Sequence, residues 1–290
     1  MDPVSTVISA SRRTDIPAFH MRWFMEGIAR GEFEVTHPFN RSVRRVPAGC
    51  PPVHSIVFWS KNFGPFLAEG YGRRLVERGY HLYFQFTVNP ENRQLEPGVP
   101  PLDERLRQLD HLCRDFGPRA VNWRLDPVCF YHEADGRTRT SSAGAERIAD
   151  AAAAAGIRSC TASLMDPYRK IARRTARLPG FGFLEVSPHR GLEALLALEA
   201  RLRPRGIRLV TCCEQALLDE LPPGSAIRAG ACIPSELLME LYGGSLSLKR
   251  DPGQRTAAGC ACRLSTDVGS YDRHPCAHGC LYCYAAPVRP

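Results

Sequence analysis

The stretch YHLYFQFTV at residues 80–88 is rich in aromatic side chains and ends in Thr-Val, which is typical of a buried β-strand. At residues 101–116, leucines recur every three or four positions, as on the apolar face of a helix, and a Gly-Pro pair ends the pattern. Another strand pattern follows at 119–125. Strand, helix and strand in this order predict a βαβ unit with parallel strands.

The same alternation extends in both directions from this unit. A further helix is predicted at 191–203. Further strands are predicted at 4–9, 54–59, 157–163, 181–186 and 207–212. Seven strands that alternate with helices predict an α/β fold, either a complete or a partial (β/α) TIM-like barrel. Because no linker or low-complexity segment divides the series, we expect residues 1–290 to form a single domain.

Composition limits the compartment and the class of protein. The chain has 290 residues, of which 44% are hydrophobic, and no apolar run is long enough to cross a bilayer. Its first residues show no basic segment followed by an apolar one, so we expect a cytoplasmic protein with no membrane partner. In that reducing compartment the twelve cysteines favour metal or redox chemistry over disulfides.

The net charge of +8 raises the question of nucleic-acid binding. Only Lys61, Lys170 and Lys249 are lysines, so the other 35 of the 38 basic residues are arginine. These arginines are spread along the chain without a basic tail, which favours an ordinary solvated surface and a composition bias. Nucleic acid stays open as a partner, but this pattern supports it weakly.

Charged residues follow several of the predicted strands. Since the carboxyl ends of parallel strands share one rim, where active sites of barrels lie, we expect these side chains to meet at one cavity. The candidates for catalysis or for binding a small or anionic substrate are Arg12, Arg13, Asp15, Lys61, Arg124 and Asp126. The alternative is internal ion pairing of the basic residues with Asp15, Asp126 and Glu185.

The cysteines are crowded into the last part of the chain. Cys50, Cys113, Cys129 and Cys160 are scattered, and we expect them to be small buried apolar residues. Hydrogen-atom donation is an alternative for Cys129, which follows the sequence RLDPV, although burial is favoured. The other eight lie in a cysteine-rich, cluster-binding region at 212–285.

Three of these eight, Cys276, Cys280 and Cys283, are spaced C-x3-C-x2-C. Three thiolates can hold three irons of a [4Fe–4S] cluster and leave the fourth iron open. The amino and carboxylate groups of S-adenosylmethionine (SAM) suit such an open iron. A zinc site with His274 or His278 as fourth ligand is the alternative.

The decapeptide CAHGCLYCYA at 276–285 resembles the signature of radical SAM enzymes, in particular those similar to spore photoproduct lyase, and Tyr282 fits the aromatic residue usual in that loop. Residues 58–62 (FWSKN) and 83–109, which contain the LEP segment, resemble later strands of the same group, and SASRRTDIP at 9–17 resembles its Thr-Asp loop.

This resemblance implies a [4Fe–4S] cluster on the three cysteines and reductive cleavage of SAM to a 5′-deoxyadenosyl radical. The radical would abstract hydrogen from an unknown substrate. The resemblance also implies an electron donor of the flavodoxin or ferredoxin type.

The order of the segments differs from that of the relatives, where the cysteine loop comes first. Here it comes last, so the chain resembles a circular permutation in which residues 264–285 supply the strand and loop that usually open the fold. We therefore expect the last strand to lie beside the first. The arrangement also resembles a domain-of-unknown-function family whose members end in this motif.

Five late cysteines remain, and they predict a second metal centre. Either Cys212 or Cys213, together with Cys232, Cys260 and Cys262, would provide four thiolates. A second [4Fe–4S] cluster is favoured, and structural zinc fits the same four. If zinc were the only metal, the protein would instead be a zinc-binding module, and such a module could contact nucleic acid through its arginines.

Overall fold

The predicted strand series forms one parallel sheet in the computed structural model, which describes residues 5–36 and 42–285. The sheet has eight strands in the described part of the chain, and every neighbouring pair in it is parallel. In spatial order the strands are β12 (Arg228–Ala229), β11 (Arg208–Thr211), β9 (Ser159–Leu164), β6 (Val121–Val128), β5 (His81–Thr87), β4 (Val53–Ser60), β1 (Thr6–Ala10) and β13 (Thr266–Asp267).

The sheet is open. Its edge strands are β12 and β13, and no pairing between them exists in the described residues, so the expectation of a complete barrel is wrong there. β13 pairs instead with β1, where Ile8 lies opposite Thr266 and Ser9 lies opposite Asp267. The last strand of the chain therefore lies beside the first.

One predicted strand belongs to a different sheet. The run at 181–186 forms β10 (Gly182–Leu184), which pairs antiparallel with β7 (Phe130–His132), and β7 pairs with β8 (Thr138–Thr140). A short apolar run predicts a strand but does not specify which strand it pairs with. Here β7, which directly follows β6, provides the edge with which β10 pairs. Glu185 is consequently exposed and lies outside the cavity described below.

The hairpin of β2 (Glu32–Thr36) and β3 (Val43–Pro47) was not predicted. The predicted helices at 101–116 and 191–203 form as α5 and α8. The helices are α1 (Ile16–Phe19), α2 (Met21–Arg30), α3 (Gly64–Ala68), α4 (Tyr71–Val76), α5 (Leu102–Phe116), α6 (Ala145–Ala154), α7 (Arg169–Thr175), α8 (Pro188–Leu202), α9 (Gln215–Leu218) and α10 (Ser235–Tyr242). Short 3-10 turns lie at Pro118–Ala120, Arg203–Arg205 and Thr256–Ala258. In the described part of the chain, no helix combines the length and apolarity that a membrane span requires.

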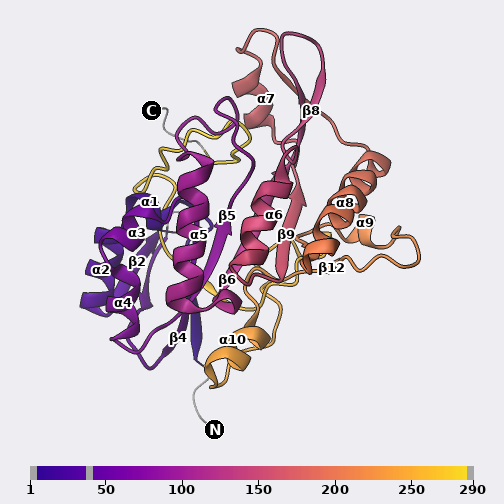
Figure 1. Ribbon diagram of the computed structural model, residues 1–290. Coiled ribbons are helices and arrows are strands. Elements are labelled where there is room, and N and C mark those ends of the chain that lie inside the picture. The colour runs from indigo at the N-terminus through magenta and orange to yellow at the C-terminus, as the bar shows by residue number, and fades with distance from the viewer. Residues whose placement is uncertain (1–4, 37–41, 286–290) are drawn as a thin grey trace.

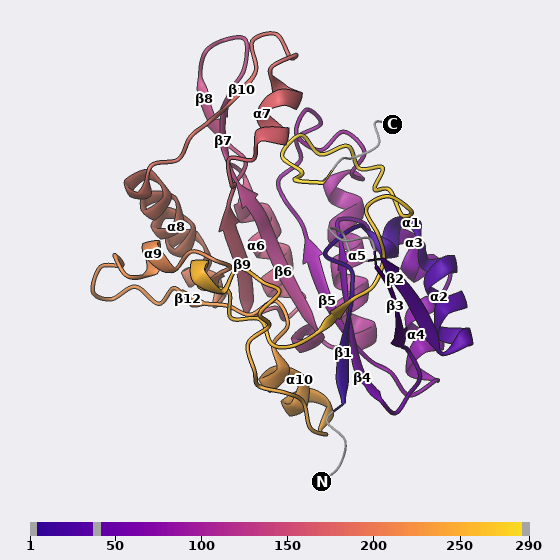
Figure 2. The same cartoon turned by 180° about the vertical axis from the view of Figure 1, so that it is seen from behind.

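The two faces of the sheet are covered differently. Helices such as α5 and α6 cover one face (Figure 1), where buried residues of β1, β4 and β5 join the main hydrophobic core. On the other face lie α10 and the chain leading into β13 (Figure 2). There Val7, Val57 and Tyr83, which alternate with the helix-facing residues, pack with Cys232 and Leu238. The C-terminal region is thus part of the same folded unit as the sheet.

Candidate functional site

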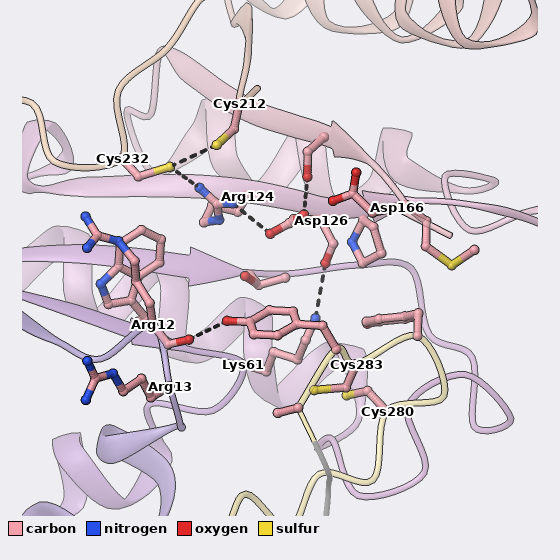
Figure 3. A pocket seen from close by; sticks show the side chains of 18 of the residues that line it. Arg12, Arg13, Lys61, Arg124, Asp126, Asp166, Cys212, Cys232, Cys280 and Cys283 are labelled. Atoms are coloured by element: carbon pink, nitrogen blue, oxygen red, sulfur yellow. Dashed lines mark hydrogen bonds and ion pairs between the residues drawn. The ribbon is translucent and has the colours of Figure 1, made fainter. Parts of the chain in front are cut away.

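A cavity of about 390 Å³ opens at the carboxyl ends of the central strands. Volumes of this size are typical of sites for small molecules. It is lined by every site residue predicted from the sequence: Arg12, Arg13, Asp15, Lys61, Arg124, Asp126, Tyr282, Cys212, Cys213, Cys232, Cys260, Cys262, Cys276, Cys280 and Cys283. Figure 3 shows Cys280 and Cys283 on one side of the cavity and Cys212 and Cys232 on the other, with Lys61, Arg124 and Asp126 between them.

The cysteine loop at 276–285 is held by its backbone. The guanidinium of Arg174, on α7, donates to the carbonyls of Cys280, Leu281, Cys283 and Ala285 at 2.8 to 3.0 Å. Because one side chain satisfies four carbonyls, the loop keeps its shape without using its thiols. Arg174 had not been predicted as a site residue, and its position in an arginine pair at 173–174 carries no signal for this role.

On its other side the loop rests on the LEP segment. The Leu281 amide donates to the Leu95 carbonyl, and the Gly98 amide donates to the His278 carbonyl, both at 2.9 Å. A β-carbon on Gly98 would come within 2.6 Å of the Ala277 carbonyl oxygen, so only glycine allows this close approach.

Neither histidine considered as a zinc ligand is free for that role. His278 lies 2.8 Å from the Asp15 carboxylate through Nε2 and 3.1 Å from the Gly98 carbonyl through Nδ1. Each ring nitrogen therefore already faces an oxygen of the protein, and neither points at an open position for a metal. His274 lines a different cavity, with its ring centroid 4.0 Å from that of Trp23.

A buried ion pair lies under the loop. Lys61 Nζ lies 2.8 Å from Glu96 Oε1, which also accepts from Asn89 at 2.9 Å and from the Tyr282 hydroxyl. Burial alone would lower the pKa of Lys61, but the Glu96 carboxylate raises it; burial would raise the pKa of Glu96, but Lys61 holds it below its usual value. Glu96 was missed, although the LEP segment that contains it had been noted.

The basic residues of the cavity are mostly paired within the protein. Arg124 donates to Asp126 at 2.7 Å and to the Cys232 sulfur at 2.8 Å, and Arg12 donates to Asp267 at 3.1 Å. Together with the Lys61–Glu96 pair, these contacts correspond to the alternative of internal ion pairing that the sequence left open. Two of the acidic partners differ from those expected, because Asp267 and Glu96 take the places of Asp15 and Glu185. Arg13 differs: it donates to the backbone carbonyls of Thr36 and Gly269, both at 3.3 Å.

Trp59 organises the two arginines and was also missed. The guanidinium carbons of Arg12 and Arg124 lie 5.5 and 5.3 Å from its ring centroid, within range of cation–π attraction. Its indole N–H donates to the Ser9 hydroxyl at 3.0 Å. The FWSKN segment contained Trp59, but nothing in its spacing distinguished this residue from a core aromatic.

The five remaining late cysteines form a ring of sulfur contacts. The Sγ atoms of Cys212 and Cys232 are 3.6 Å apart, and those of Cys212 and Cys213 are 3.7 Å apart. Cys213 also neighbours Cys260, Cys260 neighbours Cys262, and Cys262 neighbours Cys232, so the five thiols follow one another around a ring. In the described residues, no group of three or more His, Cys, Asp or Glu side chains could hold a metal ion as it is arranged.

The four scattered cysteines belong to neither group, although Cys129 packs in the same hydrophobic cluster as Cys280 and Tyr282. Cys113, Cys129 and Cys160 are buried, as expected, and burial raises the pKa of the Cys129 thiol to about 11. Cys50 is exposed, contrary to expectation, because it precedes Pro51 in the turn before β4, where its thiol donates to the Gly79 carbonyl.

The comparisons with known proteins identify a family without supplying an activity. No curated protein matches the chain. A family model described as a domain of unknown function, DUF1848, matches residues 7–285, from the second residue of β1 to the end of the cysteine loop. The chain therefore belongs to the DUF1848 family.

Proposed function

We propose that the protein is a radical SAM enzyme whose [4Fe–4S] cluster is bound by Cys276, Cys280 and Cys283. The observation that carries this proposal is the position of the C-x3-C-x2-C loop: all three cysteines line a ligand-sized cavity at the carboxyl ends of parallel strands. The donor set fits the group, because three thiolates leave one iron for SAM and His278 is not a fourth ligand.

When bound, the cluster and SAM supply reductive C–S bond cleavage and a 5′-deoxyadenosyl radical, with the electron coming from a flavodoxin-type or ferredoxin-type donor. The protein's residues position and shield this chemistry. Arg174 and the LEP segment fix the loop, while Lys61 and Tyr282 place a buried positive charge and a ring beside Cys280.

The fold of the proposed enzyme is a circularly permuted, incomplete barrel. This is supported by the parallel pairing of β13 with β1, which brings the segment before the cysteine loop next to the strand that carries Arg12 and Asp15 at its end. In the relatives that this chain resembles, the cysteine loop precedes those segments.

The substrate of this enzyme is a small molecule with an anionic group. The cavity volume sets the size, and the charge preference rests on Arg13, for which the described residues provide backbone partners but no carboxylate. The other three basic residues, Arg12, Lys61 and Arg124, are already paired with carboxylates of the protein. They therefore shape the cavity and influence the substrate through the carboxylates that they hold in place.

Anaerobic reconstitution tests the proposal. Wild-type protein is expected to turn brown, to bind iron and sulfide, and to produce 5′-deoxyadenosine from SAM when reduced with dithionite. Cys276→Ser, Cys280→Ser and Cys283→Ser, made singly, are each expected to abolish the product, whereas Cys113→Ser, which changes a buried thiol of α5, leaves it unchanged.

Continued SAM cleavage by the three loop variants would refute the assignment. A colourless protein that binds only zinc at this loop would support the zinc-binding module instead.

A further inference from the structure

The ring of Cys212, Cys213, Cys232, Cys260 and Cys262 lies across the cavity from the cysteine loop and has no part in the function proposed above. Its members come from three separate segments, after β11, after β12 and before β13. Free thiols that merely fill a core do not require such convergence. Five cysteine sulfurs that neighbour one another form an arrangement that suits a metal ion with an affinity for thiolate ligands.

The backbone at Cys213 is adapted to this convergence. Successive side chains of an extended strand point to opposite sides, so Cys212 and Cys213 would normally diverge. Cys213 instead has a φ of 64°, and it is the only non-glycine residue with a positive φ in the described part of the chain. This left-handed conformation is unfavourable for cysteine and turns both sulfurs into the ring, where Cys213 meets Cys260.

Three arginines surround the ring. Arg124 donates to the Cys232 sulfur, Arg12 interacts with Cys262 and Cys232, and Arg255 interacts with Cys213. Four thiolates around a divalent cation carry a net charge of about −2, which the arginines offset.

The sulfur separations distinguish a single ion from a cluster. Ligands at about 2.3 Å from one tetrahedral zinc ion are about 3.8 Å apart. The observed separations of 3.6 and 3.7 Å come close to that value. The thiolates of a [4Fe–4S] cluster bind different irons and are held farther apart. Zinc also binds such sites more tightly than ferrous iron.

We infer that this ring binds one zinc ion through four of its five thiolates, and that the ion clips together the two edges of the open sheet. In the described arrangement the sulfurs do not surround a single point, so binding of the ion requires the cysteine side chains to rotate toward it. This differs from the second iron–sulfur cluster that the sequence favoured.

The clip has a structural role. β12 and β13 are the two edge strands. Cys232 follows β12, Cys262 precedes β13, and the two thiols neighbour each other. The Arg263 amide donates to the Ile233 carbonyl at 3.1 Å across the same junction. The two edge strands are not paired with each other in the described residues. A metal ion at this position links them and so closes one wall of the cavity.

The test uses the full chain with Cys276, Cys280 and Cys283 replaced together by serine, so that a failure of the proposed enzyme function does not affect the result. This variant is expected to retain about one zinc ion per chain and no sulfide, with four sulfur neighbours at about 2.3 Å by X-ray absorption. Iron and sulfide at about four each per chain would overturn the inference in favour of a second cluster. The absence of stoichiometric metal would also overturn it.

Single substitutions in the same background locate the ion. Cys232→Ser, Cys260→Ser and Cys262→Ser are each expected to lose the zinc, while Cys160→Ser, a buried thiol of β9, keeps it. If a ring variant fails to fold, titration of the parent chain with a mercurial gives the same information: zinc is released as the ring thiols react. Zinc that persists after these thiols are blocked would contradict the site.

Discussion

Many charged side chains of the cavity form ion pairs and hydrogen bonds with other protein groups. Lys61 and Glu96 are the most consequential pair: Glu96 is buried, only 17% of the Lys61 side chain is exposed, and Glu96 also accepts from Tyr282 in the cysteine loop. Glu96 Oε2 is buried without a hydrogen-bond partner, so the charge of this carboxylate depends on the contacts of Oε1. Removing either partner leaves an uncompensated buried charge.

Lys61→Met is accordingly expected to lower the free energy of unfolding by about 3 kcal/mol at pH 7, measured by urea denaturation. The matched control is the double variant Lys61→Met/Glu96→Gln, which removes both charges and should recover much of the loss. Unchanged stability in Lys61→Met would show that the pair contributes nothing.

The same pair determines a dependence on acid. The pKa of Glu96 is below its usual 4.5, so its contribution to stability is present above that pH and is lost as the pH falls through the lowered value. In Lys61→Met burial loses its main opponent, although the Tyr282 hydroxyl and Arg105 still act against it, and the pKa of Glu96 rises. The midpoint of acid unfolding should then move to higher pH, and an unmoved midpoint would argue against the pair.

At the scale of elements, the cysteine loop depends on the LEP segment that supports it. The critical contact is a backbone approach, because the carbonyls of Ala277 and His278 lie where a side chain on residue 98 would begin. The loop is fixed from the other side by Arg174 of α7. Two elements far apart in the chain therefore position the three cysteines.

Gly98→Ala is expected to displace the loop and to reduce the iron bound on anaerobic reconstitution, with a stability cost of about 1–3 kcal/mol from overpacking. Gly49→Ala is the matched control, because a β-carbon there meets nothing within 4 Å. Iron content and melting temperature are measured on both variants. Equal iron content in the two would show that the close approach at Gly98 does not position the loop.

At the scale of the whole molecule, the sheet is completed by the end of the chain. β13 covers the edge of β1, Asp267 pairs with Arg12, and His278 meets Asp15. The beginning and the end of the sequence therefore form one structural unit around the cavity.

A chain that ends at residue 263 is expected to lose its cooperative thermal transition and to aggregate, because it exposes the β1 edge and removes Asp267 from Arg12 and His278 from Asp15. A chain that ends at residue 285 keeps every described residue and serves as control. Cooperative melting of the shorter chain at the control's temperature would show that the C-terminal segment is a separate unit.

The sequence by itself determined the strands of the main sheet from β1 to β11, the helices α5 and α8, and many of the charged residues and cysteines that line the cavity. These are local properties: hydrophobic periodicity specifies an element, and the carboxyl ends of parallel strands meet at one rim. The spacing of Cys276, Cys280 and Cys283 was informative for the same reason, since the three lie in one short loop.

Only the tertiary structure decided which groups meet. It placed β10 against β7, left the sheet open, paired Lys61 with Glu96 and Arg12 with Asp267, and brought both Cys212 and Cys213 to the other late cysteines, where the sequence had required only one of the two. Such contacts join residues far apart in the chain, and their partners depend on how the packed elements are oriented. A periodic pattern specifies which face of an element is buried, but the partner that this face meets is selected by the packing of the whole chain.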